Sequence, residues 1–496
     1  VVGLVTNHGY LDNPTFRGLR ASLLQSFDRL YLLDLHGHGK KGERPPEDRA
    51  DENVFSIRQG VAVALLVKKP GLSRGVFRAD LWGSRREKVD WLASHDVSDT
   101  DWTEIAPHRP HFLFARLDPE AEARYEGFVP LPEVFPVRSV GVVTGRDEFA
   151  LAFERRLLEA RIDRFCKWGP GEPVERVWPS LRRTRSWDPE TARRRVREDE
   201  HWRTRLLPIL YRPFDHRWIF YSDAVVERPR RAVMEHMLRG GNLGLVVPRQ
   251  GRGGGGAFVT RHLAGHKAVS AYDINSLFPL YVAPDPPGTG SLFAGADAEP
   301  GGGLRSNLGR DLRGRLGRAY GACPSPEEVM GYVYAVLYAP GYRAAYAPLL
   351  ELDFPRVPWP REPELFRSMA ALGGRLIDLH LLRAPDLVPP DVLLEGPKGS
   401  KVLDRPVEHH AAERRVMVSA VGHFFSGIPA AVWEYEIGGY QVLRRWLTDR
   451  RATTLSLEEI EIFCKIATAL ARTLAVQEEI DRLYSEVERD LLRPGS

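Results

Sequence analysis

The chain has 496 residues, enough for two to four domains at roughly 150 residues each. A hydrophobic content of 43% and a charged content of 27% are those of a soluble globular protein, and no apolar run reaches the roughly 18 residues of a membrane span. The three cysteines lie far apart, which argues against a disulfide framework and is typical of a reducing cytoplasm, and a net charge of +4 is too small to indicate nucleic-acid binding by itself.

Residues 1–70 alternate between predicted strands and one predicted helix. The expected elements are strands at residues 1–6, 30–35 and 60–67 and a helix at residues 16–27. A polar, glycine-rich loop fills residues 36–53, and the order of these elements predicts the closing part of an α/β sheet. Because the chain opens inside a predicted strand, we expect it to be a piece of a longer protein.

Residues 71–130 are irregular, and we expect a connector with short elements. A second α/β unit is expected at residues 131–320, where a basic stretch at 181–205 carries nine arginines against five acids, mostly at helical spacing. The strands expected in this unit lie at residues 140–144, 211–223 and 242–250.

Residues 321–496 are mostly helical in their pattern. Ser325 and Glu328 predict a capping box, with Pro326 at the first helical position. A second capping box, Ser456 with Glu459, opens a long terminal helix.

The tetrapeptide Asn13-Pro14-Thr15-Phe16 differs by one residue from Asn-Pro-Pro-aromatic, the mark of enzymes that methylate the exocyclic amine of adenine. That chemistry uses an Asn side chain and a Pro carbonyl to hold the amine, and an aromatic ring to stack on the extruded base. Here Thr15 replaces the second proline, and no glycine-rich loop that holds S-adenosylmethionine precedes the motif. We therefore interpret Asn13 as a helix cap, with Pro14 in the first turn.

Residues 251–256 match the pattern G-x-G-x-x-G after a predicted strand, with Asp273 beyond them. Only about ten residues separate the glycines from the next strand, which is short for a crossover helix. A flexible loop is favoured, and an NAD(P)-dependent oxidoreductase remains the alternative function. His262 and His266 are spaced like some metal ligands, but no third ligand lies nearby, so no metal site is expected.

Arginine is far more frequent than lysine between residues 181 and 231, and aromatic residues are interleaved with it. Most charge runs are solvated helix faces. Arginine forks, however, match phosphates and guanine edges bidentately, so we favour DNA as the partner. Arginines such as Arg194 and Arg195, on a probable helix, suit phosphates.

Arg249 and Gln250 end an apolar strand just before a glycine-rich loop. This arrangement lets the backbone lie close to a duplex while two side chains project from a rigid edge. Arginine pairs bidentately with guanine and glutamine with adenine, so the dipeptide is predicted to read bases. The alternative is that Arg249 pairs with a nearby acid.

Several blocks together resemble one family. They are "NHGYLDNPTFRGLR", "LYLLDLHG", "DENVFSIRQGVAV", "VTGRDEF", "YRPFDHRWIFY", "NLGLVVPRQ", "GYVYAVLYAPGYRAAYAPLLELDFPRVPWP", "LIDLHLL" and "IGGYQVLRRWL". Their order is similar to that in type ISP restriction–modification enzymes and related adenine-specific methyltransferases. In that family one polypeptide carries nuclease, helicase, N6-adenine methyltransferase and C-terminal target-recognition segments.

The resemblance implies that residues 1–70 are the closing strands of a Rossmann-like methyltransferase sheet, 131–320 an α/β target-recognition domain and 321–496 a helical specificity region. It places the true Asn-Pro-Pro-aromatic motif upstream, so no catalytic residue is expected in this chain and the chain alone is expected to be inactive. Asn7, Phe16 and Phe55 are expected to border the pocket for S-adenosylmethionine or the flipped base of the complete enzyme.

The implied partners are double-stranded DNA and upstream segments of the same polypeptide. The expected DNA-binding residues are Arg146, Arg194, Arg195, Arg212, Arg217, Arg230, Arg231, Arg249, Gln250 and Arg261. A scaffold protein without a nucleic-acid role is the third function considered, and any DNA-binding assay tests it.

Overall fold

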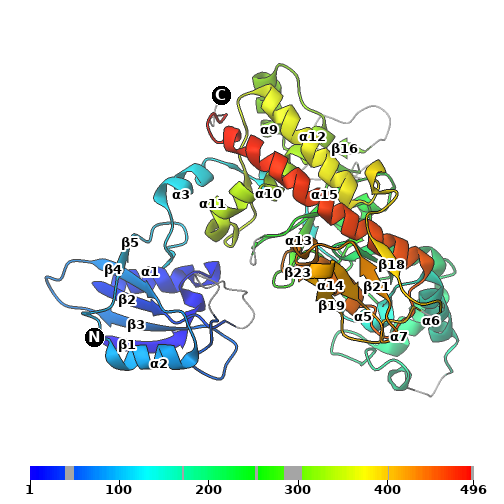
Figure 1. Cartoon of the computed structure of the whole chain (residues 1–496), viewed down its shortest axis with the longest axis horizontal. Coiled ribbons are helices and arrows are strands. Elements are labelled where there is room, and N and C mark those ends of the chain that lie inside the picture. The colour runs from blue at the N-terminus through cyan, green and yellow to red at the C-terminus, as the bar shows by residue number, and fades with distance from the viewer. Residues whose placement is uncertain (39–49, 170–172, 252–254, 284–303, 400, 493–496) are drawn as a thin grey trace. The chain divides into compact units, whose positions relative to one another are not determined.

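Figure 1 shows a computed structural model of the chain, which describes residues 1–38, 50–169, 173–251, 255–283, 304–399 and 401–492. The chain divides into two compact units, Val1–Arg124 and Tyr125–Ser496. None of the helices in these described ranges is long and apolar enough to cross a membrane.

The N-terminal unit is a five-stranded sheet in the order β1-β3-β2-β4-β5. Its strands are β1 (Val2–Asn7), β2 (Arg29–Asp34), β3 (Val61–Val67), β4 (Gly75–Asp80) and β5 (Thr103–Ile105). β3 runs antiparallel to both β1 and β2, so β1 and β2 are parallel to each other. The three strands predicted within residues 1–70 are confirmed, and so is the helix, α1 (Arg17–Ser26).

The segment 71–130, expected to be a connector, adds two strands to this sheet. β4 pairs in parallel with β2, and β5 pairs with β4. The capped helix α2 (Arg85–Ser94) lies between β4 and β5 in the chain. Val76 of β4 is buried in the same apolar cluster as Leu30 and Leu32 of β2. The sequence of β4 shows no clear strand periodicity, so its strand conformation depends on this packing against β2.

Asn13 caps a short 3-10 helix, Pro14–Phe16, through its side-chain oxygen, which accepts the Thr15 N–H at 2.9 Å. The helix-cap interpretation of Asn13-Pro14-Thr15-Phe16 is therefore confirmed. Arg20, which is fully buried, fixes the loop that precedes this short helix. Its Nη1 donates to the carbonyls of Tyr10 (2.7 Å) and Asn13 (2.8 Å).

The first half of the C-terminal unit holds two four-stranded sheets, in the orders β13-β9-β10-β8 and β12-β11-β14-β7. Their strands are β7 (Ser139–Val140), β8 (Leu151–Ala152), β9 (Leu206–Arg212), β10 (Asp215–Phe220), β11 (Gly244–Pro248), β12 (Phe258–Thr260), β13 (Leu263–Ala264) and β14 (Asn275–Pro279). The helices α6 (Arg155–Lys167), α7 (Pro189–Glu198) and α8 (Arg231–Met237) accompany them. The aromatic stretch 211–223, predicted as one strand, spans a tight turn instead, because Phe214 adopts a left-handed φ of 61° between β9 and β10.

In the described residues the second half is helical, as predicted, with a two-stranded sheet of β22 (Glu436–Ile437) and β23 (Tyr440–Gln441) and one small four-stranded antiparallel sheet. The helices are α9 (Arg310–Tyr320), α10 (Pro326–Tyr338), α11 (Pro340–Leu350), α12 (Pro363–His380), α14 (Val442–Thr448) and α15 (Leu457–Val487). The small sheet comprises β18 (Leu393–Glu395), β19 (Glu408–His410), β20 (Arg415–Met417) and β21 (Phe424–Ser426). Both predicted capping boxes, at Ser325 and Ser456, are confirmed, and Figure 1 shows α12 beside the long α15.

Two glycines allow α10 and α12 to touch through their backbones. A methyl group added to Gly373 would lie 1.8 Å from the carbonyl oxygen of Gly331, and one added to Gly331 would lie 2.5 Å from that of Ala370. Any larger side chain at Gly331 or Gly373 would force the helices apart.

A line of buried polar groups joins this bundle to its neighbours. The ring nitrogens of His380 lie 2.6 Å from the hydroxyl of Tyr334 and 3.0 Å from the Thr473 hydroxyl on α15. Tyr338 donates to the carbonyl of Ala257 at 2.7 Å. Burial, with a smaller contribution from the charge of Arg343, lowers the pKa of His380 to about 3, so the imidazole is neutral at physiological pH.

Candidate functional site

A network of buried charges joins the β9–β10 hairpin to α14. Asp215, which is 2% exposed, accepts from Arg217 at 2.8 Å and from Arg450 at 3.0 Å. Asp449 accepts from Arg217 and from Arg445, both at 2.8 Å. The guanidinium of Arg217, which was expected to contact DNA, therefore forms ion pairs with two carboxylates of the protein, Asp215 and Asp449.

Arg212 lies beside this network and has no acid within ion-pair distance among the described residues. Its Nη1 donates to the carbonyls of Tyr211 (2.8 Å) and Lys267 (3.0 Å). Its guanidinium carbon lies 4.3 Å from the ring centre of Tyr211 and 4.9 Å from that of Tyr440. Arg212 is thus a firmly held cation that forms no ion pair within the described part of the chain.

Arg146 is buried, although it was expected at the DNA surface. Its guanidinium carbon lies 3.7 Å from the ring centre of Trp187, and its Nη1 donates to the carbonyl of Val225 at 2.9 Å. Burial lowers the pKa of Arg146, against a smaller opposing effect of Glu227. This arginine fastens two loops of the fold and offers no face to a duplex.

Arg231 and Arg230 flank the start of α8. Arg231 forms an ion pair of 2.8 Å with Asp223, and Arg230, half-buried, stands at the helix cap in a left-handed conformation. Arg261 is exposed and donates to the carbonyl of Gly241 at 3.3 Å.

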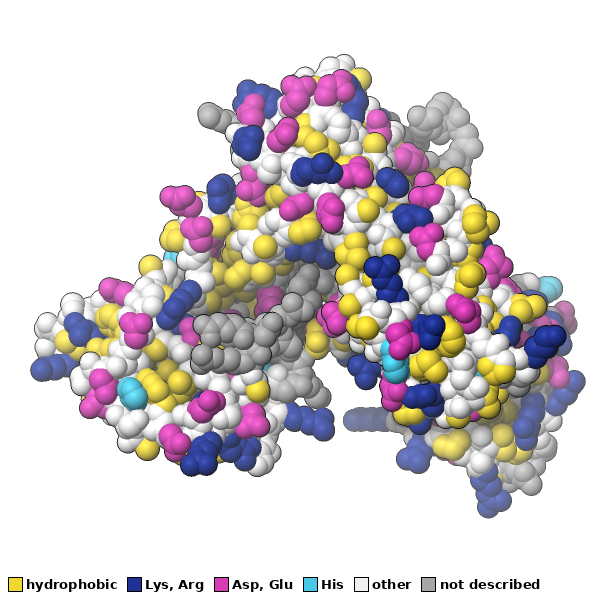
Figure 2. Space-filling model, viewed as in Figure 1, with side chains coloured by type: hydrophobic (Ala, Val, Ile, Leu, Met, Phe, Trp, Pro, Cys, Tyr) yellow, Lys and Arg dark blue, Asp and Glu magenta, His cyan; other side chains and the backbone are white. Residues whose placement is uncertain are grey.

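Arg194 and Arg195, predicted to contact phosphates, lie on α7, and both are exposed. Figure 2 shows Lys and Arg side chains scattered among Asp and Glu over much of the visible face, in keeping with the modest net charge. Of the arginines predicted to bind DNA, Arg194, Arg195, Arg249 and Arg261 are exposed in the structure, whereas Arg212 is partly buried.

Arg249 forms an exposed ion pair with Asp353, with Nε 2.7 Å from Oδ1 and Nη2 3.2 Å from Oδ2. The alternative weighed from the sequence, pairing with a nearby acid, is the arrangement in the structure. Both partners are at least half exposed, so the pair is worth little and a competing group can replace it. Gln250 follows it and is half-buried.

The glycine-rich stretch 251–256 joins β11 to β12, which pair antiparallel as a hairpin. A dinucleotide fingerprint needs a strand, a loop and then a helix that crosses to a parallel strand. A methyl group added to Gly256 would lie 2.6 Å from the Val269 carbonyl oxygen, so at least this glycine is needed for close backbone packing. The hairpin leaves the oxidoreductase alternative without support. Residues 252–254 lie outside the described residues.

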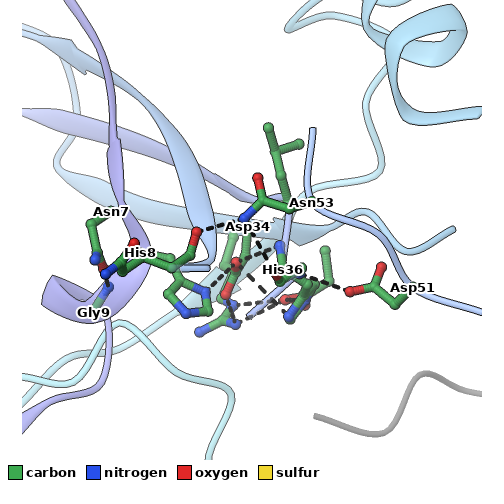
Figure 3. Close-up of polar contacts among 12 residues, drawn as sticks. Asn7, His8, Gly9, Asp34, His36, Asp51 and Asn53 are labelled. Atoms are coloured by element: carbon green, nitrogen blue, oxygen red, sulfur yellow. Dashed lines mark hydrogen bonds and ion pairs between the residues drawn. The ribbon is translucent and has the colours of Figure 1, made fainter. Parts of the chain in front are cut away.

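The N-terminal unit carries a polar cluster at the carboxyl ends of the parallel strands β1 and β2, shown in Figure 3. Asp34 lies at its centre: its Oδ1 is 2.9 Å from His8 Nδ1 and accepts the His36 backbone N–H at 3.0 Å. Its Oδ2 accepts from Arg78 at 3.0 Å. Burial alone would raise the pKa of Asp34, but the hydrogen bond from His8 and the nearby charges of His36, His8 and Arg78 outweigh it and hold that pKa well below its usual range.

His8, Asp34 and His36 are grouped closely enough to hold a metal ion. However, the positive charge that an ion would supply already comes from Arg78, which bonds both Asp34 (3.0 Å) and Asp80 (2.8 Å). The donor set therefore suits an internal ion-pair network better than a cation site.

The loop that follows β2 is fastened at both ends. The Gly37 N–H donates to Asp51 at 2.7 Å, and the Asn53 amide donates to the Gly37 carbonyl at 3.0 Å (Figure 3). Phe55, two residues after Asn53, is 49% exposed.

Asn7 and Phe16 also lie at this edge of the sheet. The side chain of Asn7 accepts the Gly9 N–H at 2.7 Å, and a methyl group added to Gly9 would contact both Asn7 and the ring of Phe16. Phe16 is 41% exposed. Two partly exposed aromatic residues and a polar cluster thus lie outside the carboxyl ends of the strands, where ligands bind in α/β sheets.

No role was predicted from the sequence for Tyr440, Arg445 or Trp446 around α14, or for the Asp34 cluster. Tyr440, Arg445 and Trp446 all lie within the block "IGGYQVLRRWL", where an aromatic–arginine mixture was the available signal. His8 and Asp34 lie 26 residues apart, and nothing local in the sequence links them.

Comparison of the sequence with models of known protein families identifies one family that matches this chain. The model of the family described as Type ISP C-terminal specificity domain matches residues 133–477. No curated protein sequence matches significantly.

Three solved structures share the fold. They are a nuclease-deletion mutant of the Type ISP restriction–modification enzyme LlaGI with a DNA substrate mimic (18% identity, 96% of this chain and 39% of that one, TM-score 0.70), the DrdV–DNA complex (24%, 97% and 50%, 0.72) and the ATP-dependent Type ISP enzyme LlaBIII bound to DNA (19%, 96% and 32%, 0.72). This chain therefore spans half or less of the length of each protein.

Proposed function

Because the chain belongs to the family of Type ISP C-terminal specificity domains, we propose that it recognises duplex DNA sequence-specifically as part of a restriction–modification enzyme. The observation that carries the proposal is the family match over residues 133–477, and the fold shared with three DNA-bound proteins agrees with it. The solvent-exposed arginines of α7, Arg212 and the exchangeable Arg249 supply the positive groups that a duplex needs.

We further propose that the complete enzyme methylates adenine N6 with S-adenosylmethionine, and that the N-terminal unit is the end of its methyltransferase sheet. Two features support this. β3 lies antiparallel between the parallel strands β1 and β2, as expected where such a sheet closes. Asn7, Phe16 and Phe55 stand at the carboxyl edge, where exposed aromatic rings suit a flipped base or the adenine of the cofactor.

The open edge of β1 supports a partner segment from the same polypeptide. β1 is an edge strand whose residues are all exposed although most are apolar, including Leu4 at 41% and Val5 at 58%. Proteins seldom leave a long apolar edge strand uncovered, because it pairs with other chains. We propose that methyltransferase strands from another segment of the same polypeptide cover this edge and complete the cofactor site.

One experiment tests both parts of the proposal. We expect the purified chain to bind duplex DNA and to enrich one sequence from a random duplex pool, but to transfer no labelled methyl group from S-adenosylmethionine. A chain that shows no preference within the pool contradicts the specificity role. Methyl transfer by the chain alone contradicts the assignment of the catalytic motif to an upstream segment.

Base reading by Arg249 requires it to leave Asp353. We expect Arg249→Ala to cost about 1–3 kcal/mol of binding on the enriched duplex and little on a scrambled one. Asp353→Asn should strengthen binding to the enriched duplex, because it frees the guanidinium and removes a carboxylate from the surface.

The matched control is Arg194→Ala on α7, which should weaken binding to both duplexes alike. Equal losses on both duplexes for Arg249→Ala would show that Arg249 contacts phosphates at most. Fluorescence anisotropy titrations of each variant with the enriched and the scrambled duplex give the dissociation constants that are compared.

A further inference from the structure

The helix α9 has a basic face that no other described element covers. Its charged residues are four arginines and one acid: Arg310, Arg313, Arg315, Arg318 and Asp311. Three of the arginines are exposed, and only Arg315 is half-buried. None of the four was predicted from the sequence to bind DNA, so this face is an addition to the predicted set.

The opposite face of α9 fixes the helix in the protein. Its buried side chains recur at every fourth position, at Leu312, Leu316 and Tyr320. The ring centre of Tyr320 lies 5.0 Å from that of Phe366 on α12, and the Tyr320 hydroxyl donates to the Pro360 carbonyl at 2.8 Å. The orientation of the basic face is therefore set before any partner binds.

The charge on this face is not balanced within the helix. Four arginines against one acid leave a net charge of +3 (4 − 1), and Asp311 lies in the first turn, where an acid offsets the partial positive charge of the helix start. Arg313 and Arg318 form no ion pair within the described part of the chain. Arg310 and Arg318 are about 12 Å apart along the axis, at a rise of about 1.5 Å per residue. Positive charge spread along a line favours an extended polyanion over a single small anion.

Two of the glycines at α9 are explained by the structure of the chain itself. A methyl group added to Gly309 would lie 2.1 Å from the carbonyl oxygen of Glu133, so a side chain does not fit there. Gly321 ends the helix in a left-handed conformation, with a φ of 74°.

The other two glycines, Gly314 and Gly317, have no such reason among the described residues. A methyl group on Gly314 would come no closer than 3.6 Å to Arg318 Nη1, and one on Gly317 no closer than 3.8 Å to the Cβ of Cys323, which are ordinary contacts. Glycine inside a helix is less stable than alanine. Gly314 lies one turn from both Arg310 and Arg318, so it bares the helix backbone between two guanidinium groups.

We propose that the basic face of α9 lies against the sugar–phosphate backbone of duplex DNA, with Arg313 and Arg318 bonded to phosphates. The charge of the face carries the proposal, and Gly314 lets the duplex approach the helix closely. The arginine fork matches phosphate oxygens in pairs. The proposal rests on the proposed function and adds a contact that sets the position of the duplex without reading its sequence.

The first test removes the two arginines together, as Arg313→Gln with Arg318→Gln. We expect anisotropy titrations at several salt concentrations to show binding about tenfold weaker on enriched and scrambled duplexes alike, and a slope of log K against log salt shallower by about two. The charge-matched control is Arg444→Gln with Arg451→Gln, two exposed arginines on and just after α14 that form no ion pair in the described residues.

The control should weaken binding less than about twofold, because it removes the same charge away from the contact. A folded α9 variant that loses no more affinity than the control overturns the proposal. An α9 variant that changes the oligomeric state in gel filtration and leaves duplex binding unchanged assigns the face to a protein partner, which also overturns it.

The second test separates a contact from a structural role by the sign of two effects. Gly314→Ala should keep or raise the midpoint of thermal unfolding, because alanine favours the helix, yet it should weaken duplex binding about threefold by holding the backbone away. A variant that is as stable as the unchanged chain and binds the duplex equally well contradicts the close approach at α9.

The third test needs no mutation, because Cys323 is a natural probe beside Gly317. It is the exposed one of the three cysteines, since Cys166 is half-buried and Cys464 buried. A saturating duplex should slow the alkylation of Cys323 by iodoacetamide severalfold, and salt that releases the duplex should restore the rate. A bound duplex that leaves this rate unchanged overturns the α9 contact and keeps the proposed function. If the unchanged chain binds no duplex, both fail together.

Discussion

Asp215→Ala is expected to lower the free energy of unfolding of the C-terminal unit by about 3–5 kcal/mol. The carboxylate is 2% exposed and accepts from Arg217 (2.8 Å) and Arg450 (3.0 Å). Arg450 has a second partner, Glu459, at 3.3 Å, and Arg217 has Asp449. Removing the central anion leaves two largely buried guanidinium groups with one acid each, and most of the cost comes from that uncompensated charge.

Urea unfolding followed by tryptophan fluorescence measures this effect, since most tryptophans lie in the C-terminal unit. The control is Asp353→Ala, which removes the acid of an exposed pair and should cost between 0 and about 1 kcal/mol. A loss of less than about 1 kcal/mol for Asp215→Ala would mean that the network adds nothing to the docking of α14.

Acidification should destabilise the C-terminal unit through His380. The folded-state pKa of about 3 lies below the unfolded value of 6.5. Below pH 6.5 the unfolded chain binds a proton that the folded protein does not accept until about pH 3, so stability is complete above pH 6.5 and falls as the pH drops. One proton corresponds to about 1.4 kcal/mol per pH unit, which gives a loss of about 2 kcal/mol at pH 5.

The variant His380→Gln isolates this contribution from those of other titrating groups. It is expected to be less stable at pH 7, because the contacts to Tyr334 and Thr473 are disturbed, but its stability should fall less steeply between pH 6.5 and pH 5. Unfolding curves of both proteins are measured at several pH values, and the slopes of the free energy of unfolding against pH are compared. Parallel slopes would rule out His380 as the source of the acid sensitivity.

The sequence by itself determined the features that depend on local chemistry. The strands of residues 1–70 follow from apolar patterning, and the helix starts at Ser325 and Ser456 follow from capping boxes whose partners are three residues away. The cap at Asn13 is equally local, since its acceptor oxygen and the Thr15 N–H are two residues apart. The blocks quoted for the resemblance also sufficed to identify the specificity family.

The tertiary structure alone decided which of the arginines predicted to bind DNA are exposed and which are engaged inside the protein. Arg217 meets Asp449 from 232 residues away and Arg249 meets Asp353 from 104 residues away, distances over which no local pattern operates. Arg146, another arginine of the same composition-based set, lies inside the fold against Trp187. Arginine identity sets the charge and the donor geometry, but burial and partners come from packing between distant segments, and these determine whether a guanidinium is structural or free to bind.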